Sequence, residues 1–114
     1  MNQEFYDAVE ANPVIAAVKN DSGLQTATAM EEIQVIFVLY GDICTIPEIV
    51  KKIKDSGKKA LVHIDLIAGL SAKEVSVEFI KRQTNADGII TTKPALVRRA
   101  KELGLFTVLR FFVI

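Results

Sequence analysis

Short apolar runs alternate with helix-like segments along the chain, and this alternation most constrains the fold. We predict strands over residues 14–18, 35–39, 61–67, 89–91 and 106–114. The segments between these runs are too long for hairpins, and they carry apolar residues at helical spacing. Strand–helix–strand units favour parallel pairing with right-handed crossovers. The chain is therefore predicted to be an α/β protein made of parallel β/α repeats.

Helix signals occur before and between the predicted strands. We predict helices over residues 5–11, 22–30, 45–56, 71–83 and 92–103. Capping-box motifs indicate that Thr45 and Ser71 begin two of them, and Gly57 ends the first of these two. In the helix after Ser71, we expect Val75, Phe79 and Ile80 to face the sheet.

Two architectures fit this alternation: a doubly wound open sheet and a (β/α) barrel. The last predicted strand ends the sequence without a polar tail or a covering helix, and an exposed apolar edge promotes aggregation. We therefore expect a barrel of the TIM type, represented by its first five strands in one partial domain over residues 1–114. Either the sequence is truncated or another chain completes the sheet, so a homo-oligomer is expected.

Composition narrows the class of protein. The 114 residues are 50% hydrophobic, and 14 acidic side chains balance 14 basic ones. This balance gives no support for a general nucleic-acid or membrane binder, although a local basic patch stays possible. Cys44 is the single cysteine, and the sequence has neither a signal peptide nor an apolar run of about 18 residues. We expect a cytoplasmic protein without a membrane partner.

Polar residues gather where the predicted strands end. The carboxyl ends of parallel strands meet at one edge, where such folds bind their ligands. We predict a ligand site from the residues at these ends: Lys19, Asp42, His63, Asp65, Gly69, Thr91, Thr92, Lys93 and Arg110. Cations, carboxylates and hydroxyls together suit a small polyol phosphate.

His63 and Asp65 lie two residues apart, on one face of an extended strand. A carboxylate within an apolar run needs a specific partner. For Asp65 the alternatives are a ligand, the backbone amides of residues 69–71, and a salt bridge with Arg110. His63 could equally contact a ligand or form a structural hydrogen bond.

Several motifs are absent from the sequence. No glycine-rich dinucleotide or triphosphate loop and no Gly-x-Ser-x-Gly elbow occurs, so we expect no cofactor and no catalytic nucleophile. One histidine and one cysteine argue against a structural zinc site, while a divalent cation between Asp42 and Asp65 is left open. Basic groups on the predicted helices form either a solvated face or a track for RNA phosphates.

Three segments resemble one protein family, the glycerol-3-phosphate-responsive antiterminators of glycerol uptake operons. They are residues 63–70, 86–93 and 109–112, in the family's order. The resemblance implies a TIM-type barrel and a bacterial cytoplasmic regulator, not an enzyme, that senses glycerol 3-phosphate and acts on leader mRNA. The matching positions, which would line the ligand pocket, are His63, Asp65, Gly69, Thr91, Thr92, Lys93 and Arg110.

Two other interpretations remain beside the regulator. One is an enzyme acting on a small phosphorylated metabolite, with His63 or Asp65 as general acid or base and Arg110 or Lys93 holding phosphate. The other is a fragment without a function of its own, because family members continue past the last predicted strand.

Overall fold

The computed structural model describes residues 14–111 of the chain. The predicted helix over residues 5–11 and the last three residues of the predicted final strand lie outside this part. The strands are β1 (Ile15–Val18), β2 (Val35–Val38), β3 (Lys59–His63), β4 (Gly88–Thr91) and β5 (Phe106–Leu109). The helices are α2 (Asp21–Ala29), α3 (Ile46–Asp55), α4 (Glu74–Gln83) and α5 (Pro94–Glu102), with a 3-10 turn η1 (Ile64–Leu66).

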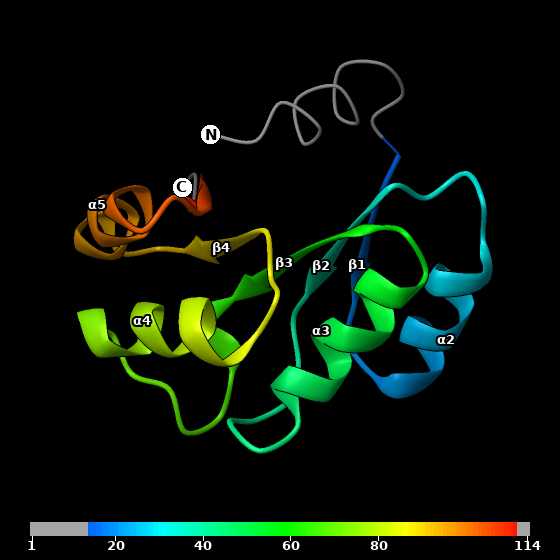
Figure 1. The fold of residues 1–114 in the computed structure, drawn as a ribbon, viewed down its shortest axis with the longest axis horizontal. Helices are drawn as coiled ribbons and strands as arrows, with labels where there is room; N and C mark the ends of the chain where they lie inside the picture. Colours follow the sequence, from blue (N-terminus) through cyan, green and yellow to red (C-terminus); the bar gives the residue numbers. More distant parts are fainter. Residues whose placement is uncertain (1–13, 112–114) are drawn as a thin grey trace.

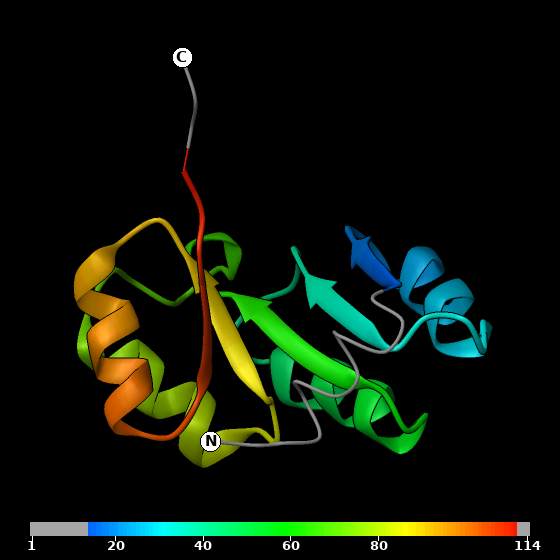
Figure 2. The same cartoon turned by 90° about the horizontal axis from the view of Figure 1, so that it is seen from above.

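The five strands form one parallel sheet in the order β1-β2-β3-β4-β5 (Figure 1). Because each strand pairs with the next along the chain, the order never reverses as it does in a doubly wound sheet. The helices lie along one side of the curved sheet, and β1 and β5 stand at opposite ends of it (Figure 2). This is the winding of a (β/α) barrel, here not closed.

The central strands of the sheet are buried on both faces. The main core lies between the sheet and the helices, and the strands contribute Val18, Ile36, Val38, Ala60, Val62 and Ile89 to it. A smaller cluster on the opposite face contains Val35, Leu61 and Ile90, packed with Phe37 and Val108. Burial on both sides explains why β2 is apolar at all four positions, as parallel strands commonly are.

The two predicted capping boxes are wrong. Before α3, Asp42 Oδ1 accepts the backbone N–H groups of Cys44 and Thr45 at 2.8 and 2.9 Å, while Thr45 Oγ1 accepts the N–H of Asp42 at 3.0 Å. Before α4, the N–H of Ser71 donates to Ser76 Oγ at 3.0 Å, and the helix begins three residues later than predicted, at Glu74. In both loops, a tighter local turn takes the groups that a capping box would use.

The buried stripe of α4 differs in part from the prediction, because Ile80 is buried as expected and Val75 is not. Ser76, Val77 and Ile80 are buried, Phe79 is half-buried, and Val75 is 61% exposed. Successive helical residues point about 100° apart, so a stripe centred on positions 77 and 80 turns Val75 toward solvent.

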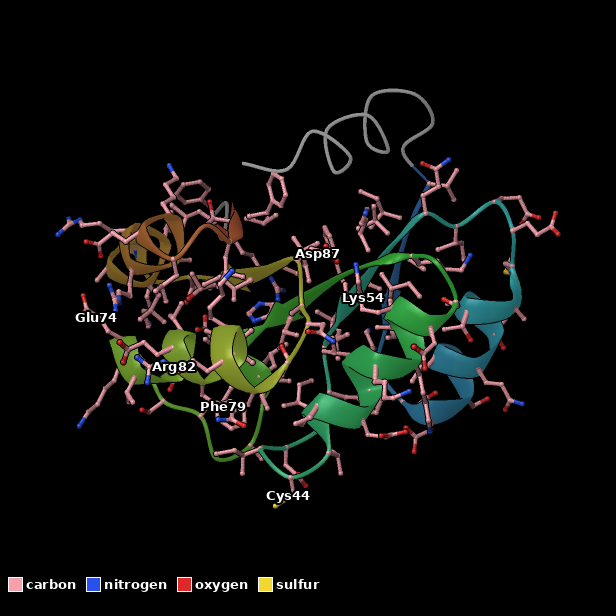
Figure 3. All side chains as sticks on the ribbon, viewed as in Figure 1. Cys44, Lys54, Glu74, Phe79, Arg82 and Asp87 are labelled. Carbon is pink, nitrogen blue, oxygen red and sulfur yellow. The ribbon has the colours of Figure 1, made fainter. Side chains whose placement is uncertain are left out.

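The amino-terminal edge of the sheet is held by three charged side chains. Asp87 Oδ2 accepts the N–H of Ala60 at 2.9 Å and lies 3.0 Å from Lys54 Nζ, which joins α3 to β4 (Figure 3). Lys58 is only 7% exposed, and its Nζ donates to the carbonyls of Met30 and Ile33 at 2.9 and 2.7 Å. These bonds fix the loop after α2.

None of the helices in residues 14–111 is long and apolar enough to span a membrane.

Candidate ligand site at the carboxyl ends of the strands

Strand β3 is shorter than predicted, and this changes the positions of His63 and Asp65. The strand ends at His63, and Asp65 lies in the 3-10 turn η1 that follows. The two side chains therefore do not share one face of an extended strand. The reason is local: the chain turns at the end of the sheet, where Ile64 and Ile67 stay buried while Asp65 and Leu66 reach the surface.

The carboxylate of Asp65 is bound by the loop that follows β4. Asp65 Oδ1 accepts the hydroxyl of Thr91 at 2.9 Å, and Oδ2 accepts both the N–H and the hydroxyl of Thr92, at 2.8 and 2.7 Å. Thr91 is fully buried, and its Oγ1 also accepts the N–H of Lys93 at 3.1 Å. Asp65 thus fixes the two threonines and, through Thr91, the backbone of Lys93.

This network keeps Asp65 ionised. Burial alone would raise the pKa of the carboxyl group, but the hydrogen bonds from Thr92 and Thr91 outweigh it, and the pKa is lowered. The predicted need for a specific partner is confirmed. That partner is the pair of threonines and not the amides of residues 69–71, among the residues described.

His63 and Arg110 meet at the ends of β3 and β5. Arg110 directly follows β5 and is exposed, whereas His63 is 2% exposed, and Arg110 Nη1 lies 3.3 Å from His63 Nε2. Burial lowers the pKa of His63, and the positive charge of Arg110 lowers it further, although Asp65 acts in the opposite direction. The imidazole is therefore neutral at pH 7. Arg110 was predicted on the last strand; it lies just beyond it.

Asp42 and Gly69 belong to a neighbouring pair of loops. Asp42 pairs with Ala68 in an isolated parallel bridge, and its carboxylate organises the start of α3. Gly69 has φ +93°, and a Cβ there would lie 2.9 Å from Ile43, so the two loops meet closely at this glycine. Both residues fix the conformation of these loops at the carboxyl edge of the sheet. Asp42 Oδ1 already accepts two backbone N–H groups there.

Lys19 lies at the far end of the same edge, on the exposed turn between β1 and α2. Its neighbour Asn20 caps α2 by accepting the N–H of Gly23 at 2.7 Å. Two strands stand between β1 and β4, so Lys19 is the predicted residue most separated in the sheet from the Asp65 network.

A small hollow lies between the loops after β3 and β4. It has a volume of about 290 Å³ and is lined by Asp65, Leu70, Ser71, Ala72, Thr92 and Lys93. Leu70, Ser71 and Ala72 were not among the predicted site residues. Their position in the sequence, directly after the Gly69 turn, could have indicated them, because the βα loops of barrels supply ligand contacts.

The acidic and basic side chains at this edge differ in whether they have a bonding partner. Oxygens of Asp42 accept hydrogen bonds from its own loop and those of Asp65 from Thr91 and Thr92, whereas Lys19, Lys73 and Lys93 are exposed and form no ion pair with the residues described. The accessible charge is consequently more positive than the composition suggests. Within residues 14–111 no group of three histidine, cysteine or acidic side chains could hold a metal ion.

Several basic residues on or next to the helices form ion pairs or are buried. Lys51 pairs with Asp55, Lys54 with Asp87, and Arg99 with Glu78 at 2.7 Å. Lys58 is buried. The exposed cations on the last two helices are Lys81, Arg82, Arg98 and Lys101.

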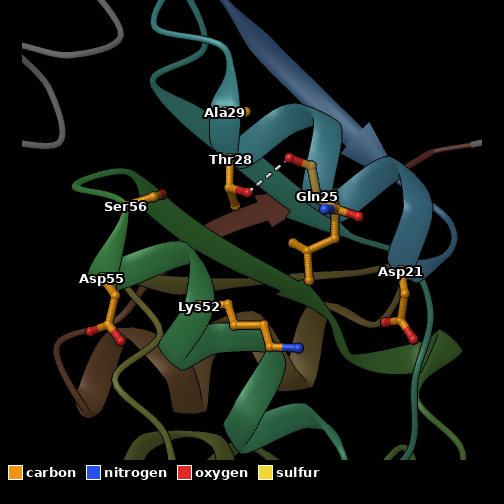
Figure 4. A pocket seen from close by; sticks show the side chains of 8 residues that line it. Asp21, Gln25, Thr28, Ala29, Lys52, Asp55 and Ser56 are labelled. Carbon is orange, nitrogen blue, oxygen red and sulfur yellow. Dashed lines mark hydrogen bonds between the residues drawn. The ribbon is translucent and has the colours of Figure 1, made fainter.

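A larger groove of about 760 Å³ runs between α2 and α3 on the outer surface (Figure 4). Lys52 reaches into it from α3, and the hydroxyl of Thr28 donates to the carbonyl of Gln25 at 3.1 Å within α2. None of the predicted site residues lines this groove.

Comparisons with known proteins agree with this architecture. Residues 14–114 match the family model described as "Glycerol-3-phosphate responsive antiterminator". The chain is 52% identical over 103 residues to the uncharacterized protein YgcP of Escherichia coli K12, covering 90% of this chain and 53% of that protein.

Two crystal structures share the fold. The glycerol uptake operon antiterminator regulatory protein of Listeria monocytogenes superposes with a TM-score of 0.85 at 26% identity, covering 90% of this chain and 56% of that one. A glycerol uptake operon antiterminator-related protein of Thermotoga maritima gives a TM-score of 0.78 at 36% identity, with 89% and 56% covered.

The chain thus spans a little over half the length of these relatives. The strand order, the loops at the carboxyl edge and the match over residues 14–114 lead to one assignment. The chain belongs to the glycerol-3-phosphate-responsive antiterminator family.

Proposed function

We propose that this chain senses glycerol 3-phosphate at the carboxyl edge of its sheet and controls transcription antitermination by binding leader mRNA in the bacterial cytoplasm. The observation that carries the proposal is the Asp65 network, which fixes the loop bearing Thr92 and Lys93 around a hollow of about 290 Å³. A small effector fits a hollow of this size.

The chemistry of the edge supports a phosphorylated polyol. The exposed amines of Lys73 and Lys93 would attract the phosphate, while the hydroxyls of Ser71 and Thr92 could exchange hydrogen bonds with the glycerol moiety. The predicted ligand residues Lys19, Asp42, His63, Thr91 and Arg110 remain part of this proposal. No cofactor is required.

A regulator is favoured over an enzyme by the state of the two candidate acid–base groups. Asp65 accepts three hydrogen bonds and has a lowered pKa, which makes its carboxylate a poor base. His63 is buried. The environments of Asp65 and His63 therefore favour ligand binding over catalysis.

RNA binding would depend on exposed cations. Arg98 and Lys101 on α5 and Lys81 and Arg82 on α4 are exposed and could contact phosphates without reading bases. We further propose that the chain associates with a second copy of itself, because β1 and β5 are the outer strands of an unclosed sheet. Size-exclusion chromatography with light scattering tests this second point: a stable monomer at micromolar concentration would contradict it.

The test of the sensor function is filter retention of labelled leader RNA from a glycerol uptake operon, with and without glycerol 3-phosphate. We expect retention to increase with the effector and to fall as salt is raised. Glycerol and inorganic phosphate serve as effector controls, and a scrambled RNA serves as the nucleic-acid control. RNA retention that does not change with glycerol 3-phosphate at millimolar concentration would contradict the sensor proposal.

A further inference from the structure

The imidazole of His63 is a buried polar group at the carboxyl edge. It ends β3 and is 2% exposed, on the face that also carries Leu61. Its two ring nitrogens differ sharply. Nε2 lies 3.3 Å from Arg110 Nη1, whereas Nδ1 is buried and has no hydrogen-bond partner among the described residues.

The contact with Arg110 determines which nitrogen carries the proton. A guanidinium group has only donors, so His63 Nε2 can take part in this hydrogen bond only as the acceptor. A neutral imidazole has one N–H, which must then lie on Nδ1. Burial and the positive charge of Arg110 both keep the ring neutral by lowering its pKa. The backbone of His63 itself acts in the opposite direction by raising the pKa of the ring. It nevertheless forms no hydrogen bond with Nδ1.

An unfilled donor in a buried position costs free energy. Native proteins retain such groups rarely, and often at functional sites. Here the donor needs an oxygen acceptor, and the guanidinium beside the ring makes a negatively charged oxygen the preferred one.

We propose that the Nδ1–H of His63 donates to a phosphate oxygen of the bound effector, with Arg110 supplying the neighbouring positive charge. This inference rests on the proposed sensor function and deepens it, because it adds a buried phosphate contact to the exposed amines of Lys73 and Lys93. Asp65 then acts as a positioning residue for the loop after β4. Since Nδ1 is buried, the phosphate reaches it only when the groups that cover the ring move aside.

Nitrogen NMR of the imidazole tests the tautomer directly. The chain contains one histidine, so specific ¹⁵N-histidine labelling gives the signals of a single ring. In the ligand-free protein we expect the proton on Nδ1, with Nε2 as the unprotonated acceptor. Glycerol 3-phosphate should move the Nδ1 proton signal downfield. A proton on Nε2 in the free protein would overturn the inference.

Two substitutions separate the two ring nitrogens. In His63→Asn the amide N–H lies near the place of Nδ1, and in His63→Gln it lies near the place of Nε2. We expect His63→Asn to bind glycerol 3-phosphate within about threefold of wild type, and His63→Gln to bind roughly 10- to 100-fold more weakly. Melting curves of both variants show whether they are folded. Equal affinities of the two folded variants would contradict the assignment.

Inorganic phosphate distinguishes failure of the inference from failure of the proposed function. If glycerol 3-phosphate binds without changing the Nδ1 signal, the contact is wrong and the sensor proposal stands. If phosphate changes that signal and glycerol 3-phosphate does not bind, the effector is wrong and the anion contact stands. If neither probe binds or changes the signal, both are wrong.

Discussion

Asp65 Oδ2 accepts both the backbone N–H and the hydroxyl of Thr92, at 2.8 and 2.7 Å. One carboxylate oxygen of the 3-10 turn after β3 thereby fixes the first residue after β4. Because Lys93 follows immediately, the position of the lysine depends on a residue that precedes it by 28 positions in the sequence.

Asp65→Asn should loosen this connection. The amide group presents N–H donors to at least one threonine donor, and the charge that strengthens the bonds is lost. We expect the free energy of unfolding to fall by roughly 1–2 kcal/mol, since Asp65 is partly exposed to solvent. Urea titration followed by circular dichroism measures this.

Asp55→Asn is the matched control for that variant. Asp55 pairs with Lys51 at 2.6 Å, but both side chains are more than 60% exposed, and exposed pairs within a helix contribute little to stability. If both variants lose the same stability, the Asp65 network has no special importance.

Acidification should destabilise the protein in two stages. The pKa of His63 is lowered from 6.5 by burial, so below pH 6.5 the unfolded chain takes up the proton more readily than the folded one. Stability is therefore lost as the pH falls from 6.5 through the folded pKa. The pKa of Asp65 is lowered from 3.8, and its contribution is lost below that value. Urea unfolding across this range measures both stages. In His63→Asn the first stage should disappear, and its persistence would show that another group causes it.

Lys58→Met should be strongly destabilising for a substitution of lysine. The buried Nζ donates to the carbonyls of Met30 and Ile33, and methionine keeps most of the side-chain length but leaves both oxygens without this donor. We expect a loss of about 2–3 kcal/mol in urea unfolding. Lys52→Met, at an exposed position on α3, should change stability by less than about 0.5 kcal/mol. Equal losses in the two variants would contradict the structural assignment of Lys58.

Gly88→Ala should disturb the pairing of β4 with β5. A Cβ at Gly88 would lie 2.4 Å from the backbone oxygen of Phe106, so the two strands must separate. We expect a loss of about 3 kcal/mol, and reduced amide protection in β5 on hydrogen exchange. At Gly23 in α2 the nearest atom would be 3.4 Å away, so Gly23→Ala should not destabilise. An unchanged Gly88→Ala protein would contradict the register of these strands.

The order of elements could be predicted from the sequence because each strand is a compact apolar run. The run over residues 35–39 became β2, and the parallel pairing followed from the length of the crossovers. The winding as a barrel was also predicted, and the structure establishes it through a strand order that never reverses.

Local details at the loops could not be predicted. The apolar run over residues 61–67 extends past the end of β3, because Ile64 and Ile67 are buried in and just after the turn that follows. The periodicity of the sequence does not distinguish this turn from a strand. The partners of Asp65 lie 26 and 27 residues further along the chain, at positions where only the tertiary structure brings them together. A capping-box pattern likewise cannot reveal that Asp42 already accepts the N–H groups of Cys44 and Thr45 in the same loop.

The most direct test of the account is isothermal titration calorimetry of glycerol 3-phosphate with the wild-type chain and two variants, Lys93→Met and Lys52→Met. Lys93 lines the hollow at the carboxyl edge, whereas Lys52 lines the groove between α2 and α3. We predict measurable binding to wild type, a loss of roughly tenfold or more in affinity for Lys93→Met, and no change for Lys52→Met. Absence of binding at millimolar ligand, or equal weakening by both substitutions, would contradict an effector site at this edge.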